Sequence, residues 1–142
     1  MEALSFAGNA LERNFQVWNK ANNLENWCKA MTALGDVSWR LSQFDAKEKF
    51  FAHIARAKSY YEAVRNNCSE VVLKYYYAIS ERRLANIYSD REFSASEKEF
   101  YSNLEMGLRL YDSSLKLTSK SASPVDWGDI TTQYRTIIYS TF

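Results

Sequence analysis

The apolar residues of this chain recur at an interval of about 50 residues. Trp27 corresponds to Tyr77 and Trp127, and small residues recur at their own positions as well as bulky ones. Intervals of roughly 20 to 50 residues are typical of repeat proteins, in which each unit buries its apolar face against its neighbours. The aligned sets are Leu34, Leu84 and Tyr134; Val37, Ile87 and Ile137; Leu4, Ile54 and Leu104; Leu11, Tyr61 and Tyr111; and Ala7, Ala57 and Gly107.

The spacing within each unit predicts α-helices. In residues 24–42 the apolar side steps by four and three residues through Trp27, Met31 and Leu34, as one face of a helix requires. The chain has only 4 glycines and 1 proline, too few for the frequent turns of an all-β fold. We therefore expect one all-α domain spanning residues 1–142, with about six helices over 3–20, 24–42, 45–66, 69–89, 96–115 and 124–142. By propensity alone, residues 70–79 also fit a strand.

Capping residues predict where several helices begin. Asp45 is followed three residues later by Glu48, which fits an Asp variant of the capping box at the start of the third helix. Side-chain oxygens at such positions accept from backbone N–H groups that the helix leaves unpaired. Similar signals predict helix starts at Ser69, at Ser94 or Ser96, and at Ser123 followed by Pro124.

Gly35 lies in the middle of the expected helix over residues 24–42. Glycine costs a helix interior about 1 kcal/mol relative to alanine, so the position needs a reason. The next unit has Ala85 there, and the third has Arg135. We expect a small residue at this position to let the paired helix pack closely, so that leucine there would destabilise the fold by about 1–3 kcal/mol.

The second expected helix resembles the first helix of a tetratricopeptide repeat. That family places an aromatic residue, then Leu-Gly, then another aromatic, which here are Trp27, Leu34-Gly35 and Trp39. The pattern returns at Leu84, Ala85 and Tyr88, and more loosely at Trp127 and Tyr134. The chain departs from the family in its longer unit and in lacking the proline that ends the second helix. The resemblance implies a solenoid of antiparallel helix pairs whose concave face binds a partner segment.

By the same resemblance, the residues that line the concave face fall on the first helix of each pair. Arg82 and Asn86 lie one turn apart, so an arginine and an amide there could hold a carboxylate. Thr32 and Asp36 stand where carboxylate-binding members of the family carry Lys and Asn. The alternative is that these polar side chains are only solvated. The partner-binding residues expected on this basis are Lys29, Thr32, Asp36, Trp39, Arg40, Arg82, Arg83 and Asn86.

The resemblance implies a non-enzymatic adaptor that binds a protein or peptide in this groove. The alternative is a structural or assembly subunit that packs on other chains through its apolar terminal helices. The last expected helix keeps apolar residues to its end, at Ile137, Ile138, Tyr139 and Phe142. These side chains are either buried within the domain, or form a homo-oligomer interface, or mark the chain as a piece of a longer solenoid. Clustered tyrosines at 60–61 and 75–77 fit either an interface or a core between repeats.

Composition excludes several other classes. A net charge of +1 favours neither nucleic acid nor anionic membrane, and no apolar run is long enough to span a bilayer. The first residues lack the basic and apolar regions of a signal peptide, so we expect a cytoplasmic protein. No metal-binding motif and no glycine-rich phosphate loop is present, so we expect no enzymatic activity, no metal and no cofactor.

Three residues with reactive side chains have unremarkable sequence contexts. His53, the single histidine, lies beside the apolar stripe of the third helix, and the sequence identifies no carboxylate to orient it as a base. Cys28 and Cys68 are not spaced as a redox or zinc pair, so we expect two reduced, partly buried thiols. The alternative is a disulfide or a shared reactive site, since a helical hairpin would bring both to the same end.

Overall fold

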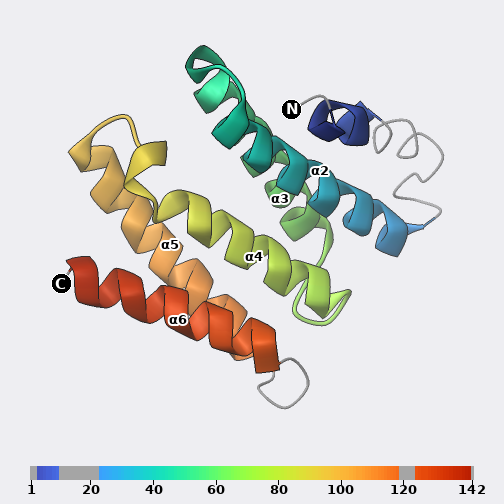
Figure 1. Cartoon of the computed structure of the whole chain (residues 1–142). Helices are drawn as coiled ribbons and strands as arrows, with labels where there is room; N and C mark the ends of the chain where they lie inside the picture. Colours follow the sequence, from blue (N-terminus) through green and yellow to red (C-terminus); the bar gives the residue numbers. More distant parts are fainter. Residues whose placement is uncertain (1–2, 10–22, 119–123, 142) are drawn as a thin grey trace. The chain divides into compact units, whose positions relative to one another are not determined.

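The computed structural model describes residues 3–9, 23–118 and 124–141 (Figure 1). All regular structure in these ranges is helical, which confirms the all-α prediction. The elements are α2 (Leu24–Phe44), the 3₁₀ turn η1 (Lys47–Lys49), α3 (Phe50–Asn67), α4 (Lys74–Tyr88), the 3₁₀ turn η2 (Arg91–Phe93), α5 (Glu97–Leu117) and α6 (Pro124–Thr141). Residues 3–9 are also helical, and the rest of the first expected helix lies outside the described residues.

The chain divides into two compact units, Met1–Asn67 and Cys68–Phe142. The first unit contains the antiparallel hairpin of α2 and α3. The second contains the hairpin of α4 and α5, with α6 packed on α5. Short connections join the helices of each hairpin, which makes the paired helices antiparallel neighbours.

Gly35 is the point of closest approach in the first hairpin. A Cβ built on Gly35 would lie 2.5 Å from Cε1 of Tyr61, so the tyrosine ring occupies the space of the missing side chain. Tyr61 is 1% exposed, and its hydroxyl donates a 2.5 Å hydrogen bond to Asp36 Oδ1. The expected close packing at Gly35 is confirmed. The core around it consists of Trp27, Met31, Leu34, Ile54, Ala57 and Val64.

The second hairpin repeats these contacts 50 positions later. Ala85 is fully buried at the position of Gly35, and Tyr111 donates a hydrogen bond to Asn86 as Tyr61 does to Asp36. Gly107 lies where the first hairpin has Ala57, and a Cβ there would meet the carbonyl oxygen of Ala85 at 3.2 Å. Burial raises the pKa of the Tyr111 phenol above its ordinary value of 10.0. The 50-residue interval thus relates two hairpins with the same buried positions.

Helix α6 is held on the second hairpin by apolar contact. Ile130 is 1% exposed and lines a small cavity of about 50 Å³ together with Ala78 and Ser114. The buried Ser114 hydroxyl donates to the carbonyl oxygen of Ala78, which joins α5 to α4 beside it. Arg135 of α6, at the position of Gly35 and Ala85, is exposed.

Helix starts agree only in part with the capping predictions. Ser96 caps α5 as expected, with its hydroxyl accepting from the Glu99 N–H at 3.1 Å. The capping box at Asp45 is wrong, because Asp45 ends α2 and its carboxylate turns toward His53. Ser123, the expected cap of α6, lies outside the described residues.

Ser69 is likewise not the cap of the fourth helix. Its hydroxyl accepts from the N–H groups of Val71 and Val72 in a tight turn, and α4 begins five residues later at Lys74. The residue before the helix, Leu73, has a left-handed backbone with φ 51°. The alternative of a strand over residues 70–79 is excluded, because this stretch is a turn followed by α4.

Candidate functional site

The expected partner-binding residues of the first unit split into two groups. Lys29 and Arg40 are exposed on α2, and Trp39 is 39% exposed. Thr32 and Asp36 instead make internal contacts, since Thr32 Oγ1 donates to the Cys28 carbonyl and Asp36 accepts from Tyr61. Only the first group offers side chains that are unengaged by these internal bonds.

The expected residues of the second unit are also partly engaged. Asn86 accepts the Tyr111 hydroxyl, so its side-chain oxygen is used within the hairpin. Arg82 and Arg83 are half-buried, and Arg82 lines the small cavity beside Ile130. The carboxylate site expected at Arg82 and Asn86 therefore stays a prediction, with the Asn86 amide N–H groups left to serve it.

A larger groove runs along α6, where the sequence predicts an interface. Its volume is about 350 Å³, and Ile138 and the 83%-exposed Tyr139 contribute to its wall. Ile137 is half-buried and does not line it, and Phe142 lies outside the described residues. The lining residues are Leu115, Trp127, Thr131, Tyr134, Arg135, Ile138 and Tyr139.

The groove on α6 has the register of a buried helix face. Five of its lining residues, shifted by 50 and 100 positions, fall on residues that the hairpins use internally. In α2 all five equivalents are buried, and Gly35 among them contacts Tyr61 of α3. The matched positions are Trp27 with Trp127, Met31 with Thr131, Leu34 with Tyr134, Gly35 with Arg135, and Ser38 with Ile138. A face that α3 covers in the first unit is thus open in α6.

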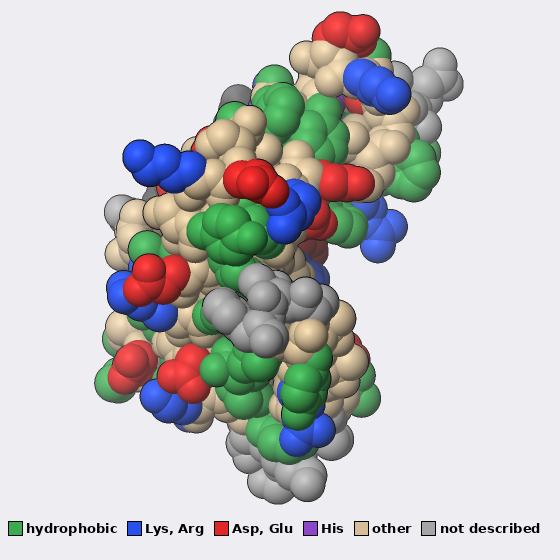
Figure 2. All heavy atoms as spheres, turned by 90° about the vertical axis from the view of Figure 1, so that its left-hand side faces the viewer, with side chains coloured by type: hydrophobic (Ala, Val, Ile, Leu, Met, Phe, Trp, Pro, Cys, Tyr) green, Lys and Arg blue, Asp and Glu red, His purple; other side chains and the backbone are tan. Residues whose placement is uncertain are grey.

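Other large apolar side chains lie singly on the surface. Val71 is 88% exposed, Tyr75 57% and Phe51 57%, so part of the aromatic surplus reaches solvent, as expected. Figure 2 shows hydrophobic side chains of this kind among charged ones on one face. None of these three lines the groove on α6.

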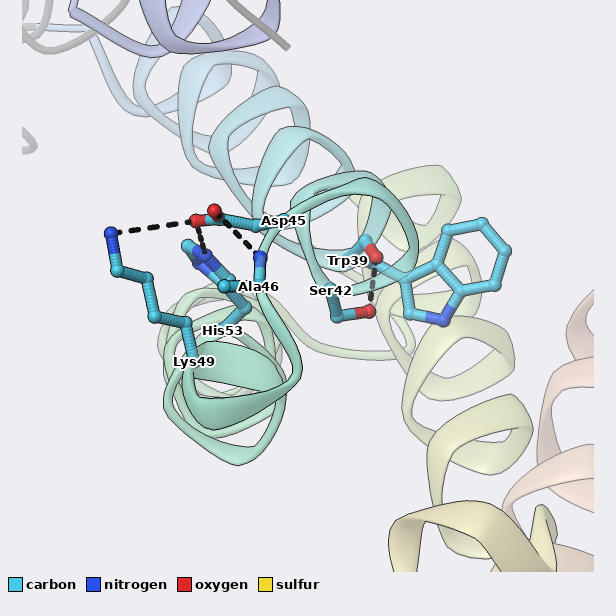
Figure 3. A network of polar contacts seen from close by, with 6 residues as sticks. All are labelled: Trp39, Ser42, Asp45, Ala46, Lys49 and His53. Carbon is cyan, nitrogen blue, oxygen red and sulfur yellow. Dashed lines mark hydrogen bonds and ion pairs between the residues drawn. The ribbon is translucent and has the colours of Figure 1, made fainter.

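A second candidate site lies in the first unit, where α2 ends and α3 begins (Figure 3). His53 Nε2 and Asp45 Oδ2 are 2.8 Å apart, and His53 is 9% exposed. Asp45 Oδ1 also accepts from the Ala46 N–H at 2.8 Å, and Lys49 Nζ lies 3.9 Å from Oδ2. These donors, His53 first among them, lower the pKa of Asp45 below its ordinary value of 3.8.

This pair supplies the orienting carboxylate that the sequence did not identify for His53. Both residues border a cavity of about 160 Å³, together with Ser38, Arg56 and Tyr60 and with apolar side chains of α2. Nδ1 of His53 is buried and has no hydrogen-bond partner in the part of the chain that the structure describes. A His–Asp pair beside a cavity can bind or exchange a proton with a small ligand.

Cys28 and Cys68 are buried free thiols, so the expectation of two reduced cysteines is confirmed and the disulfide is absent. Within residues 3–9, 23–118 and 124–141, no three His, Cys, Asp or Glu side chains are grouped to hold a metal ion. Across the same ranges, no helix combines the length and the apolar character needed to cross a membrane.

Comparisons with known proteins found no matching family model, no similar curated protein and no similar solved structure. The function must therefore be inferred from the two sites themselves.

Proposed function

We propose that this chain is a non-enzymatic protein-interaction module that binds an amphipathic α-helix in the groove on α6. The observation that carries the proposal is the register of the groove. Its five matched residues occupy positions that are buried in α2, where Gly35 receives a side chain from a paired antiparallel helix. A helix lying antiparallel to α6 would cover Trp127, Tyr134 and Ile138 in the way that α3 covers their equivalents.

The residue types in the groove support the same proposal. Tryptophan, tyrosine and arginine contribute most often to binding energy at protein interfaces. The groove carries one tryptophan, two tyrosines and one arginine: Trp127, Tyr134, Tyr139 and Arg135. Arg135 is exposed at the position where the hairpins have a small residue, so the bound helix needs space and an acidic side chain opposite it.

This proposal follows the assembly alternative more closely than the concave-groove hypothesis. Asp36 and Asn86, two expected groove residues, each accept a tyrosine hydroxyl inside a hairpin. A tetratricopeptide-like solenoid, a cytoplasmic location and a protein or peptide partner remain parts of the proposal.

A selection from a library of amphipathic helical peptides tests the proposal. Selected peptides should carry an acidic residue facing Arg135, and in amide and side-chain NMR spectra they should shift the signals of Trp127, Tyr134 and Ile138. Peptides that shift only α2 and α3 would contradict the proposal. A library that yields no helical binder would contradict it as well.

A further inference from the structure

The cavity beside Asp45 and His53 has no role in the proposed interaction and is built for a different kind of ligand. One end is polar, with Asp45, His53 and Arg56, and the wall formed by Leu34, Val37 and Leu41 of α2 is apolar. The volume of about 160 Å³ is close to that of an engineered cavity that binds benzene, about 150 Å³. A ligand of roughly six non-hydrogen atoms with one polar end fits this shape.

The hydrogen bond to Asp45 determines what His53 can offer such a ligand. An ionised carboxylate only accepts, so the proton of this bond is on Nε2 of His53. The buried Nδ1 therefore accepts a hydrogen bond when the imidazole is neutral and donates one when it is protonated. Asp45 stabilises the protonated form by its charge at 2.8 Å.

The charges around the cavity favour an anion. With His53 protonated, Asp45 contributes −1, and His53 and Arg56 contribute +1 each, which gives +1. Lys49 lies near Asp45, but its side chain is 65% exposed and does not line the cavity. The residues from 3–9 that line it, Leu4, Ser5, Gly8 and Asn9, are uncharged.

The second hairpin shows that the charged pair is not needed to build this part of a unit. The positions of Asp45 and His53 are taken there by Ala95 and Asn103. Asn103 Nδ2 donates to Ser94 Oγ at 3.3 Å, a neutral bond between the helix start and the preceding turn. Met106 stands in place of Arg56. The ionic group belongs to the first unit alone.

We propose that this cavity binds a small monocarboxylate, with His53 Nδ1–H and Arg56 donating to the carboxylate and a short apolar tail lying against Leu34, Val37 and Leu41. Binding takes up one proton when His53 is neutral beforehand, because a neutral imidazole pinned to Asp45 has no hydrogen on Nδ1. The affinity therefore falls as the pH rises, while the contact with Arg56 is retained.

NMR of the imidazole tests the proposal, since His53 is the only histidine and its ring signals need no assignment. Butyrate is the probe, butyramide its neutral isostere, and an N-acetylated dipeptide provides the carboxylate of a peptide end. We expect a saturable shift of the His53 ring with butyrate at about pH 6, with butyramide about tenfold weaker or more. Equal binding of butyrate and butyramide, tighter binding of the dipeptide, or no saturable shift would each overturn the proposal.

Two variants and a control complete the test, with affinities measured by calorimetry. His53→Asn installs the residue that the second unit carries, and it should weaken butyrate binding about tenfold or more. Arg56→Gln changes an exposed side chain, so it should fold and also weaken butyrate binding. Lys49→Gln should leave the affinity unchanged. Butyrate affinity that is unaltered in both His53→Asn and Arg56→Gln would overturn the proposal.

Discussion

The hydroxyl of Tyr61 donates a 2.5 Å hydrogen bond to Asp36, 25 residues earlier, across the α2–α3 hairpin. Tyr111 donates to Asn86 over the same 25 residues across the α4–α5 hairpin. A buried tyrosine needs a partner for its hydroxyl, and both hairpins provide it from the residue after the small one. The bond therefore fixes the register of the two helices in each unit.

The packing at Gly35 predicts a loss of stability on adding a single methyl group. Gly35→Ala gains helix propensity, but its Cβ meets the Tyr61 ring at 2.5 Å, and that ring is buried and hydrogen-bonded. We expect the free energy of unfolding to fall by about 1–3 kcal/mol, measured by urea denaturation.

Gly128 provides the matched control in α6. A Cβ there has no atom within 4 Å, so Gly128→Ala should leave the unfolding free energy unchanged or raise it by up to about 1 kcal/mol. Equal effects of the two substitutions would mean that close packing does not explain Gly35.

The two tyrosine bonds predict unequal losses. Tyr61→Phe removes a donor from a carboxylate, and Tyr111→Phe removes one from a neutral amide. Hydrogen bonds to charged groups contribute more, so we expect losses of about 1.5–3 and 0.5–1.5 kcal/mol respectively, measured by chemical denaturation. A larger loss for Tyr111→Phe would contradict this difference.

Asp45 predicts a fall of stability in acid. Its pKa is lowered in the folded protein, chiefly by the bond from His53, so the folded state binds the proton more weakly than the unfolded chain does. Its contribution is complete above the ordinary pKa of 3.8 and is lost as the pH falls through the lower folded value. Denaturant midpoints measured from about pH 7 to pH 2.5 should show this loss, and Asp45→Asn should remove part of it.

The sequence predicted the features that depend on spacing. Gly35, Ala85 and the helix faces around them follow from period and residue size, which one chain of letters displays directly. The cap at Ser96 followed from a local pattern that nothing else contested.

The features it missed depend on competition between neighbours. Asp45 had two partners in reach, the N–H groups of a following helix and the imidazole of His53, and only the folded geometry decides for His53. Ser69 closed a local turn in preference to capping a helix, and the chain then needed a left-handed residue at Leu73. The eight-residue separation of Asp45 and His53 across a helix boundary was the one available signal.

Binding of a selected helical peptide to an Ile138→Glu variant tests the central claim most directly. Ile138 lines the groove on α6, and Val71, which is 88% exposed and lies outside it, provides the control Val71→Glu. With folding checked by circular dichroism, we expect fluorescence anisotropy to show affinity about tenfold weaker or more for Ile138→Glu, and no change for Val71→Glu. Unchanged affinity in Ile138→Glu, or an equal loss in both variants, would contradict a helix-binding groove on α6.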